Sequence, residues 1–100
     1  MDLNTPEGPV IHLEGECDMA SIDALNAAGR EAIGAASAGG RMTIDLRALT
    51  FLDSSGLGAL VAIRNAATDK NIALRLRSVP RQASRILALT AMEDFFEIEP

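Results

Sequence analysis

The feature that most constrains this chain is a change of hydrophobic period between residues 42 and 63. Met42, Ile44 and Leu46 alternate with polar residues, which is typical of a strand with one more deeply buried face. After Gly56 the apolar residues instead follow the spacing of an amphipathic helix, with alanines, which are good helix formers, between them. The sequence therefore predicts a strand, a short polar turn and a helix.

The turn reads Asp53-Ser54-Ser55-Gly56. Asp and Ser are preferred N-cap residues because their side-chain oxygens accept the unpaired N–H groups of the first turn, so Asp53, Ser54 or Ser55 is expected to start the helix. Gly56 and Gly58 lack a β-carbon, which would let a partner or an anion approach this first turn. The helix dipole favours negative charge there. A serine hydroxyl is therefore expected at a helix N-terminus.

The segment Phe51–Leu60, with Gly15-Glu-Cys-Asp18 upstream, closely resembles the STAS domain, and specifically the free-standing anti-sigma-factor antagonists of bacteria. The resemblance extends from about Val10 to Ile98 and implies a single STAS-like α/β domain over residues 1–100. In that family a kinase, which is also the anti-sigma factor, phosphorylates the first serine of the Asp-Ser-Ser-Gly turn. The matching residue here is Ser54, and Ser55 is the second choice.

The resemblance also implies a partner-binding surface around this turn. Asp18 either caps the next helix or, as the Asp of the family's Gly-Glu-Leu-Asp pattern, lies near the turn on that surface. Cys17 replaces the usual leucine of the pattern, and a buried cysteine behaves as a small hydrophobe. Leu57 is expected to protrude between two glycines as an apolar anchor. The candidate partner-binding residues are Asp18, Asp53, Ser54, Ser55, Gly56, Leu57 and Gly58.

The rest of the chain predicts a small, mostly parallel sheet with three main helices packed on it. Strand, helix and strand recur, and such crossovers are right-handed in about 98% of cases. The expected elements are an edge hairpin within residues 1–9, a strand at Val10–Glu16, a helix from Asp18 or Ser21 to Gly39-Gly40, a strand at Met42–Arg47, a helix from Ser55 to about Asp69, a strand at Ile72–Arg77, a helix from Pro80 to about Thr90, and a terminal segment with Phe95, Phe96 and Ile98 on the core.

Composition excludes several classes of protein. The 100 residues, 48% of them hydrophobic with three Phe as the only aromatics, are enough for one aliphatic core. A single cysteine, Cys17, excludes an intramolecular disulfide and fits a reducing compartment. No stretch approaches the roughly 20 apolar residues of a membrane helix, and a net charge of −5 opposes nucleic-acid binding. We expect a cytoplasmic protein without membrane or nucleic-acid partners.

A serine at a strand-to-helix turn also occurs in hydrolases, but the other parts of that site are missing. The nucleophile elbow needs a glycine two residues before the serine, where Ser54 has Leu52 and Ser55 has Asp53. The only histidine, His12, precedes the serines, so the hydrolase order of Ser, Asp and His is not met, and His12 is expected at the sheet surface. One His and one Cys predict no metal site. We expect no catalysis and no cofactor.

The resemblance to the STAS family implies two candidate functions. The first is an anti-sigma-factor antagonist that binds an anti-sigma factor with serine-kinase activity and is released when Ser54 is phosphorylated, with a phosphatase as a further partner that resets it. The second is a STAS subunit without a switch, in a stress-signalling scaffold or in a membrane complex for phospholipid or anion transport. A purely structural alternative is that Ser54 or Ser55 caps the helix, since serine caps are common at helix starts and only one of the two serines is needed.

Overall fold

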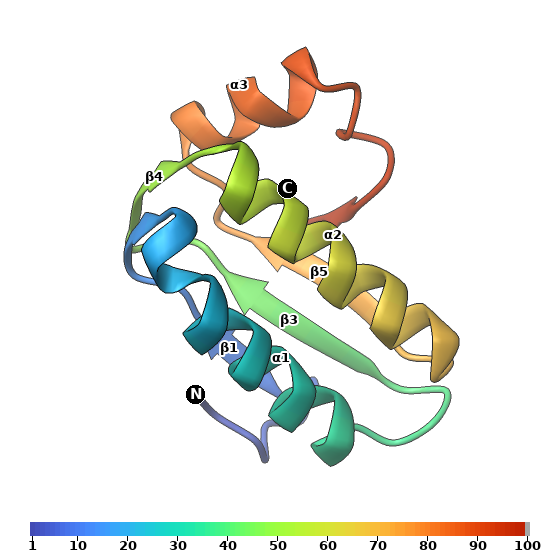
Figure 1. Ribbon diagram of the computed structural model, residues 1–100. Coiled ribbons are helices and arrows are strands. Elements are labelled where there is room, and N and C mark those ends of the chain that lie inside the picture. Colours follow the sequence, from blue (N-terminus) through green and yellow to red (C-terminus); the bar gives the residue numbers. More distant parts are fainter. Residues whose placement is uncertain (100) are drawn as a thin grey trace.

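The computed structural model describes residues 1–99 and places parallel strands behind two long helices that lie side by side (Figure 1). The helix-covered sheet agrees with the α/β class predicted from the alternating strand and helix patterns. The elements are β1 (Val10–His12), β2 (Gly15–Cys17), the 3₁₀ helix η1 (Met19–Ser21), α1 (Ile22–Ala35), β3 (Arg41–Asp45), β4 (Leu49–Leu52), α2 (Ser54–Asp69), β5 (Ala73–Arg77), α3 (Arg81–Leu89) and β6 (Glu97–Ile98).

The strands form two parallel groups. The larger has the order β1-β3-β5-β6, and the smaller consists of β2 paired with β4. Every strand pair is parallel, and the predicted N-terminal hairpin is present as one antiparallel bridge between Asp2 and Val10. The predicted fold class, a mostly parallel sheet with an N-terminal edge hairpin and three main helices, is confirmed.

The prediction of one continuous strand over Val10–Glu16 is wrong, because the chain turns inside it. Leu13 N–H still donates to Asp45 of β3 at 3.0 Å. Gly15 then has φ of 71°, in the left-handed region that glycine adopts without steric strain. The chain leaves the main sheet there, and β2 pairs instead with β4, a strand that the periodicity did not reveal. This short β2–β4 ribbon carries the candidate site.

The helices α1 and α2 bury an aliphatic core against the sheet, as expected from the composition. Met42 and Ile44 of β3 are fully buried, and so is Leu60 of α2. Gly29 lets the two helices approach, because a β-carbon at this position would lie 2.8 Å from Ile63 of α2. Packing therefore explains one of the two glycines within α1, while Gly34 faces open space.

The other side of the main sheet carries a row of charged residues. His12, Asp45 and Arg77 are aligned across β1, β3 and β5, which places His12 at the sheet surface as predicted. Arg77 Nη2 lies 3.0 Å from Asp45 Oδ2, and His12 Nε2 lies 3.1 Å from Asp2 Oδ2. Burial alone would raise the pKa of Asp45, but hydrogen bonds from Arg77 and the Arg47 backbone outweigh it and hold the pKa below its ordinary value.

The C-terminal part closes one end of the molecule. The helix α3 lies near the carboxyl ends of the strands and contacts β4, and the chain then returns to add β6 beside β5 (Figure 1). Phe96 packs in the core as predicted, whereas Ile98 is 37% exposed on β6. Within residues 1–99, no helix has the length and apolar character needed to cross a membrane.

Candidate functional site

The Asp-Ser-Ser-Gly turn forms the start of α2. Asp53 has extended backbone geometry, and its Oδ1 accepts a hydrogen bond of 2.9 Å from Gly56 N–H. Asp53 is therefore the N-cap, and Ser54 and Ser55 are the first two helical residues. Of the three caps that the sequence allowed, Asp53 is the one used. Ser54 and Ser55 do not serve as the cap, since the Asp53 carboxylate already accepts the hydrogen bond from the Gly56 amide.

The two serines differ in exposure. Ser54 is exposed and Ser55 is partly buried. Within the described residues 1–99, the side-chain hydrogen bonds of the turn come from Asp53 and involve neither serine hydroxyl. His12, the one histidine, pairs with Asp2 and Asp45 on the sheet rather than with Ser54. Ser54 thus presents its hydroxyl to solvent with no histidine to activate it as a nucleophile.

The β2–β4 ribbon brings Asp18 to this turn. Cys17 of β2 is aligned with Leu52 of β4, and Asp53 N–H donates to Cys17 O at 3.2 Å. Asp18 and Asp53 each follow one of these aligned residues, so they lie at the ends of neighbouring strands, where the spacing is about 4.8 Å. Asp18 also caps η1 by accepting from Ala20 N–H at 3.0 Å. Asp18 therefore both caps a helix, η1, and lies beside the Asp-Ser-Ser-Gly turn.

The absence of a side chain at Gly56 allows close packing of α2 on β2 and does not open the turn to a partner. Gly56 is buried, and a β-carbon there would lie 2.4 Å from Cys17 O and 2.6 Å from Cys17 Sγ. The expectation that Gly56 opens the turn to a partner is therefore wrong, because the missing side chain instead seats α2 directly on β2. Gly58, in contrast, is exposed with open space around it, as expected for a residue that allows close approach.

Cys17 lies beneath the turn as a buried apolar residue. Its side chain is completely inaccessible to solvent. Burial raises the pKa of the Cys17 thiol and outweighs the hydrogen bond with Ser21, which lowers it, while the carboxylates of Asp53 and Asp18 add smaller effects in the same direction as burial. The thiol therefore stays protonated and shielded, which fits the small hydrophobe expected at this position.

The expectation that Leu57 protrudes is also wrong. Leu57 is only 6% exposed and belongs to the main hydrophobic core. Gly56, the residue before it, lies directly against β2, so this first turn of α2 packs closely on the ribbon and Leu57 is buried with it. Leu57 holds the turn in place from below and does not offer an apolar anchor to a partner.

Gln82 is a site residue that the sequence reasoning missed. Its side-chain amide lies against β4, where Oε1 accepts from Leu52 N–H and Nε2 donates to Leu52 O, each at 2.8 Å. The amide thus replaces a neighbouring strand at the residue directly before Asp53. The available signal was a glutamine beside Ala83 and Ile86 on the inward face of α3, where a polar side chain needs a partner.

Two exposed hydrophobic residues near the turn were also missed. Met19, directly after Asp18, is 76% exposed, and Phe51, two residues before Asp53, is 45% exposed. Large apolar side chains at the surface become informative when they gather near polar residues that are suited to binding. Phe51 is aligned with the exposed Glu16 on β2, so acidic and apolar groups occur together on this ribbon.

Comparison with known proteins gives the family. The family model described as Mlab, STAS domain, matches residues 3–98. The chain belongs to the STAS domain family. A STAS-domain containing protein of Pseudomonas aeruginosa (strain UCBPP-PA14) is 38% identical over 58 residues, which is 58% of this chain and 57% of that protein. The aligned part thus spans little more than half of this relative.

Solved structures share the STAS fold at low sequence identity. A candidate anti-sigma factor antagonist from Thermotoga maritima has a TM-score of 0.75 at 18% identity, covering 89% of this chain and 77% of the other. The anti-sigma factor antagonist SpoIIAA in its unphosphorylated form has a TM-score of 0.71 at 21% identity, covering 99% and 84%. A sulfate transporter family protein from Wolinella succinogenes reaches 0.68 at 14% identity, covering 90% and 75%. At these identities the likeness concerns the fold.

Proposed function

We propose that this STAS domain is an anti-sigma-factor antagonist of the partner-switching kind. It binds an anti-sigma factor with serine-kinase activity while Ser54 is unmodified, and phosphorylation of Ser54 releases it, with a phosphatase resetting the switch. The observation that carries the proposal is the exposed Ser54 at the first position of α2, with Asp53 already serving as the cap. A serine that is not needed for capping is available as a phosphate acceptor.

Charge is the proposed cause of release. Phosphate adds about −1.5 to −2 charges and three acceptor oxygens at one point. At Ser54 this charge arises next to Asp53 and near Asp18, so repulsion and desolvation increase where the partner must approach. The N-terminus of α2 stabilises an anion by typically 0.3 to 1 kcal/mol, which favours the phosphorylated protein in its free state. Affinity is lost without any change of fold.

The proposed docking surface combines acidic and apolar contacts. Asp18, Asp53, Ser54, Ser55 and Gly58 supply the polar part around the turn. Met19 and Phe51, which are exposed beside these carboxylates, replace the buried Leu57 as candidate apolar anchors. Apolar side chains that become desolvated at the centre of an interface commonly dominate its energy. The partner surface is expected to offer basic side chains together with apolar pockets.

A kinase assay tests this function. The protein would be incubated with ATP and each small soluble kinase of the anti-sigma type from the same genome, followed by phosphosite mapping with mass spectrometry. We expect phosphate on Ser54 in the wild type and in Ser55→Ala, and none in Ser54→Ala. Phosphate on Ser55, or no phosphorylation by any of these kinases, would contradict the proposal. Unreacted Ser54→Ala should still bind the kinase.

The second candidate is a STAS subunit without a switch in a membrane transport complex. It is favoured by the fold that this chain shares with a sulfate transporter family protein. In that case the same ribbon and turn would contact a transporter subunit permanently. Co-purification separates the two functions, because a soluble kinase that leaves on addition of ATP supports the switch and a membrane transporter that stays bound supports the subunit.

A further inference from the structure

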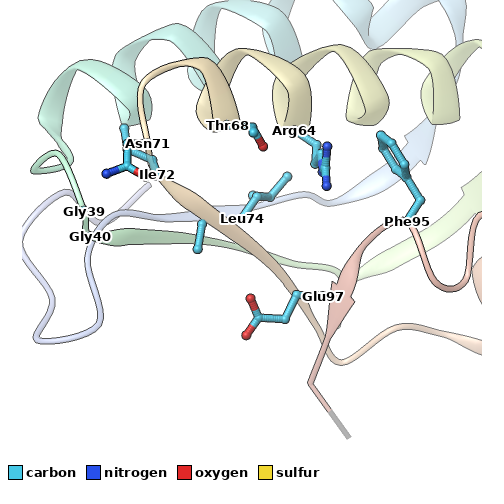
Figure 2. Close-up of a pocket in the computed structure, with 10 residues that line it drawn as sticks. Gly39, Gly40, Arg64, Thr68, Asn71, Ile72, Leu74, Phe95 and Glu97 are labelled. Atoms are coloured by element: carbon cyan, nitrogen blue, oxygen red, sulfur yellow. The ribbon is translucent and has the colours of Figure 1, made fainter.

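A groove lies at the other end of α2, away from Ser54. It has a volume of about 360 Å³ and is bordered by α2, by the start of β5 and by β6 (Figure 2). The groove exists because β6 is short and pairs with β5 only at Arg75 and Leu76. The preceding strand residue, Leu74, therefore has no β6 residue aligned with it, and its side chain forms part of the groove.

The groove has an apolar floor and polar groups along one wall. Ile72 and Leu74 are buried and form the floor, and Phe95 stands at one end (Figure 2). Arg64 and Thr68 project from α2, where a separation of four residues places them on the same face. The volume lies at the lower end of the range for ligand pockets, and apolar walls with a few polar groups are typical of such pockets.

Arg64 is the group that points to an anion. Its guanidinium carbon lies 4.3 Å from the centre of the Phe95 ring, a cation–π contact that limits the positions of this long side chain. Among residues 1–99, carboxylates pair with Arg75 and Arg77, and Arg64 takes part in none of these ion pairs. Its one side-chain hydrogen bond, to Asn65 Oδ1, is long at 3.5 Å. Arg64 thus retains donors for a carboxylate.

The surroundings limit the charge of such a ligand to one. The last turn of α2 carries the negative end of the helix dipole, and the net charge of the protein is −5. Both oppose any anion in proportion to its charge, so a doubly charged phosphate is disfavoured more than a monoanion, whose single charge Arg64 can balance. The acidic Glu97 on the far wall is 3.4 Å from Arg75, so its charge is partly compensated and does not exclude a monoanion. The apolar floor requires that the rest of the ligand be apolar.

We propose that this groove binds a small monocarboxylate with an apolar body. The carboxylate accepts hydrogen bonds from Arg64 and Thr68, and the body lies on Leu74 beside Phe95. The site is separate from the phosphoacceptor turn, since Arg64 follows Ser54 by ten residues, which is about 15 Å along a helix. The proposal does not depend on whether Ser54 is phosphorylated.

Titration of the full chain with benzoate tests the site. Amide chemical shifts would be followed by NMR, with phenyl phosphate and benzyl alcohol as the dianionic and neutral comparisons. We expect saturable shifts at Gly40, Thr68 and Leu74 with a millimolar dissociation constant for benzoate, and binding at least tenfold weaker for both comparison compounds. Absence of saturation, or shifts centred on the Ser54 turn, would overturn the proposal.

Variants separate Arg64 from general charge effects. Arg64→Gln should weaken benzoate binding at least tenfold, whereas Arg30→Gln, which removes the same charge from an exposed position on α1, should leave it unchanged. Both variants should show the dispersed spectrum of the wild type, which confirms folding. Equal weakening by the two substitutions, or none by Arg64→Gln, would show that the groove does not hold the carboxylate.

Discussion

The two ends of α2 differ in how they are held. At the N-terminal end, the turn is fixed by the Asp53 cap, the hydrogen bond to Cys17 O and the clamp of Gln82 on Leu52. At the C-terminal end, the helix borders an open groove that contains the partly buried Arg64. The difference suggests that a charge added at Ser54 alters binding rather than shape, whereas the groove has room to take up a ligand.

The strongest test of the rigid end is Leu57→Ala. Because Leu57 is in the core beneath the turn, this substitution should lower the free energy of unfolding by about 2 to 5 kcal/mol. Affinity for the kinase per folded molecule should stay level, since Leu57 offers the partner almost no surface. Denaturant unfolding and titration measure the two quantities. Val61→Ala, at a half-buried position on the same helix, should lower stability less. A drop in affinity with unchanged stability would restore Leu57 as an exposed anchor.

A smaller effect is expected when the Gln82 clamp is removed. Gln82→Ala leaves Leu52 N–H and C=O without their partners, which should destabilise the protein by about 1 to 3 kcal/mol. Amide hydrogen exchange at Leu52 should also become faster. The matched control is Thr90→Val, which removes a side-chain hydrogen bond to Ile86 O at the opposite end of α3 and should leave exchange at Leu52 unchanged. Unchanged exchange in Gln82→Ala would mean that the clamp does not hold the turn.

The smallest effect distinguishes the cap from its neighbour. Asp53→Ala should lower stability by about 0.5 to 2 kcal/mol, the usual value for an N-cap. Ser55→Ala should change it by no more than about 0.5 kcal/mol, because within residues 1–99 the Ser55 hydroxyl makes no side-chain hydrogen bond in the turn. Thermal unfolding of both variants beside the wild type measures the difference. Equal losses would show that Ser55 shares the capping role.

Much of the fold could be predicted because the hydrophobic period and the turn and capping residues indicated the same element boundaries. The alternation at Met42, Ile44 and Leu46 predicts a strand, and the polar turn at Asp53 predicts the start of a helix. The break in the first strand could not be predicted, because it depends on Gly15 in a left-handed conformation and on pairing with β4. Strand pairing between segments more than 30 residues apart leaves no local signal in the sequence.

The candidate site was predicted less well than the fold. The turn was predicted from the change of period and from its capping residues, and it lies at the start of α2. For Asp18 the sequence left two alternatives, of which the position beside the turn came from the family resemblance. The inward position of Leu57 and the packing role of Gly56 could not be read from the sequence, because they depend on how closely α2 lies on Cys17. Gln82 binds the backbone of Leu52, which lies 30 residues earlier in the sequence, and a local residue pattern cannot identify such a distant partner.

The most direct test of the proposed switch is calorimetric titration of the protein against the kinase identified in the phosphorylation assay. A charge left unpaired at an interface commonly costs 2 to 5 kcal/mol, and about 1.4 kcal/mol corresponds to a tenfold change in affinity. Ser54→Asp should therefore bind roughly thirtyfold more weakly than wild type or worse, while Ser54→Ala should bind as tightly as wild type. If Ser54→Asp binds as tightly as wild type, Ser54 is not the switch.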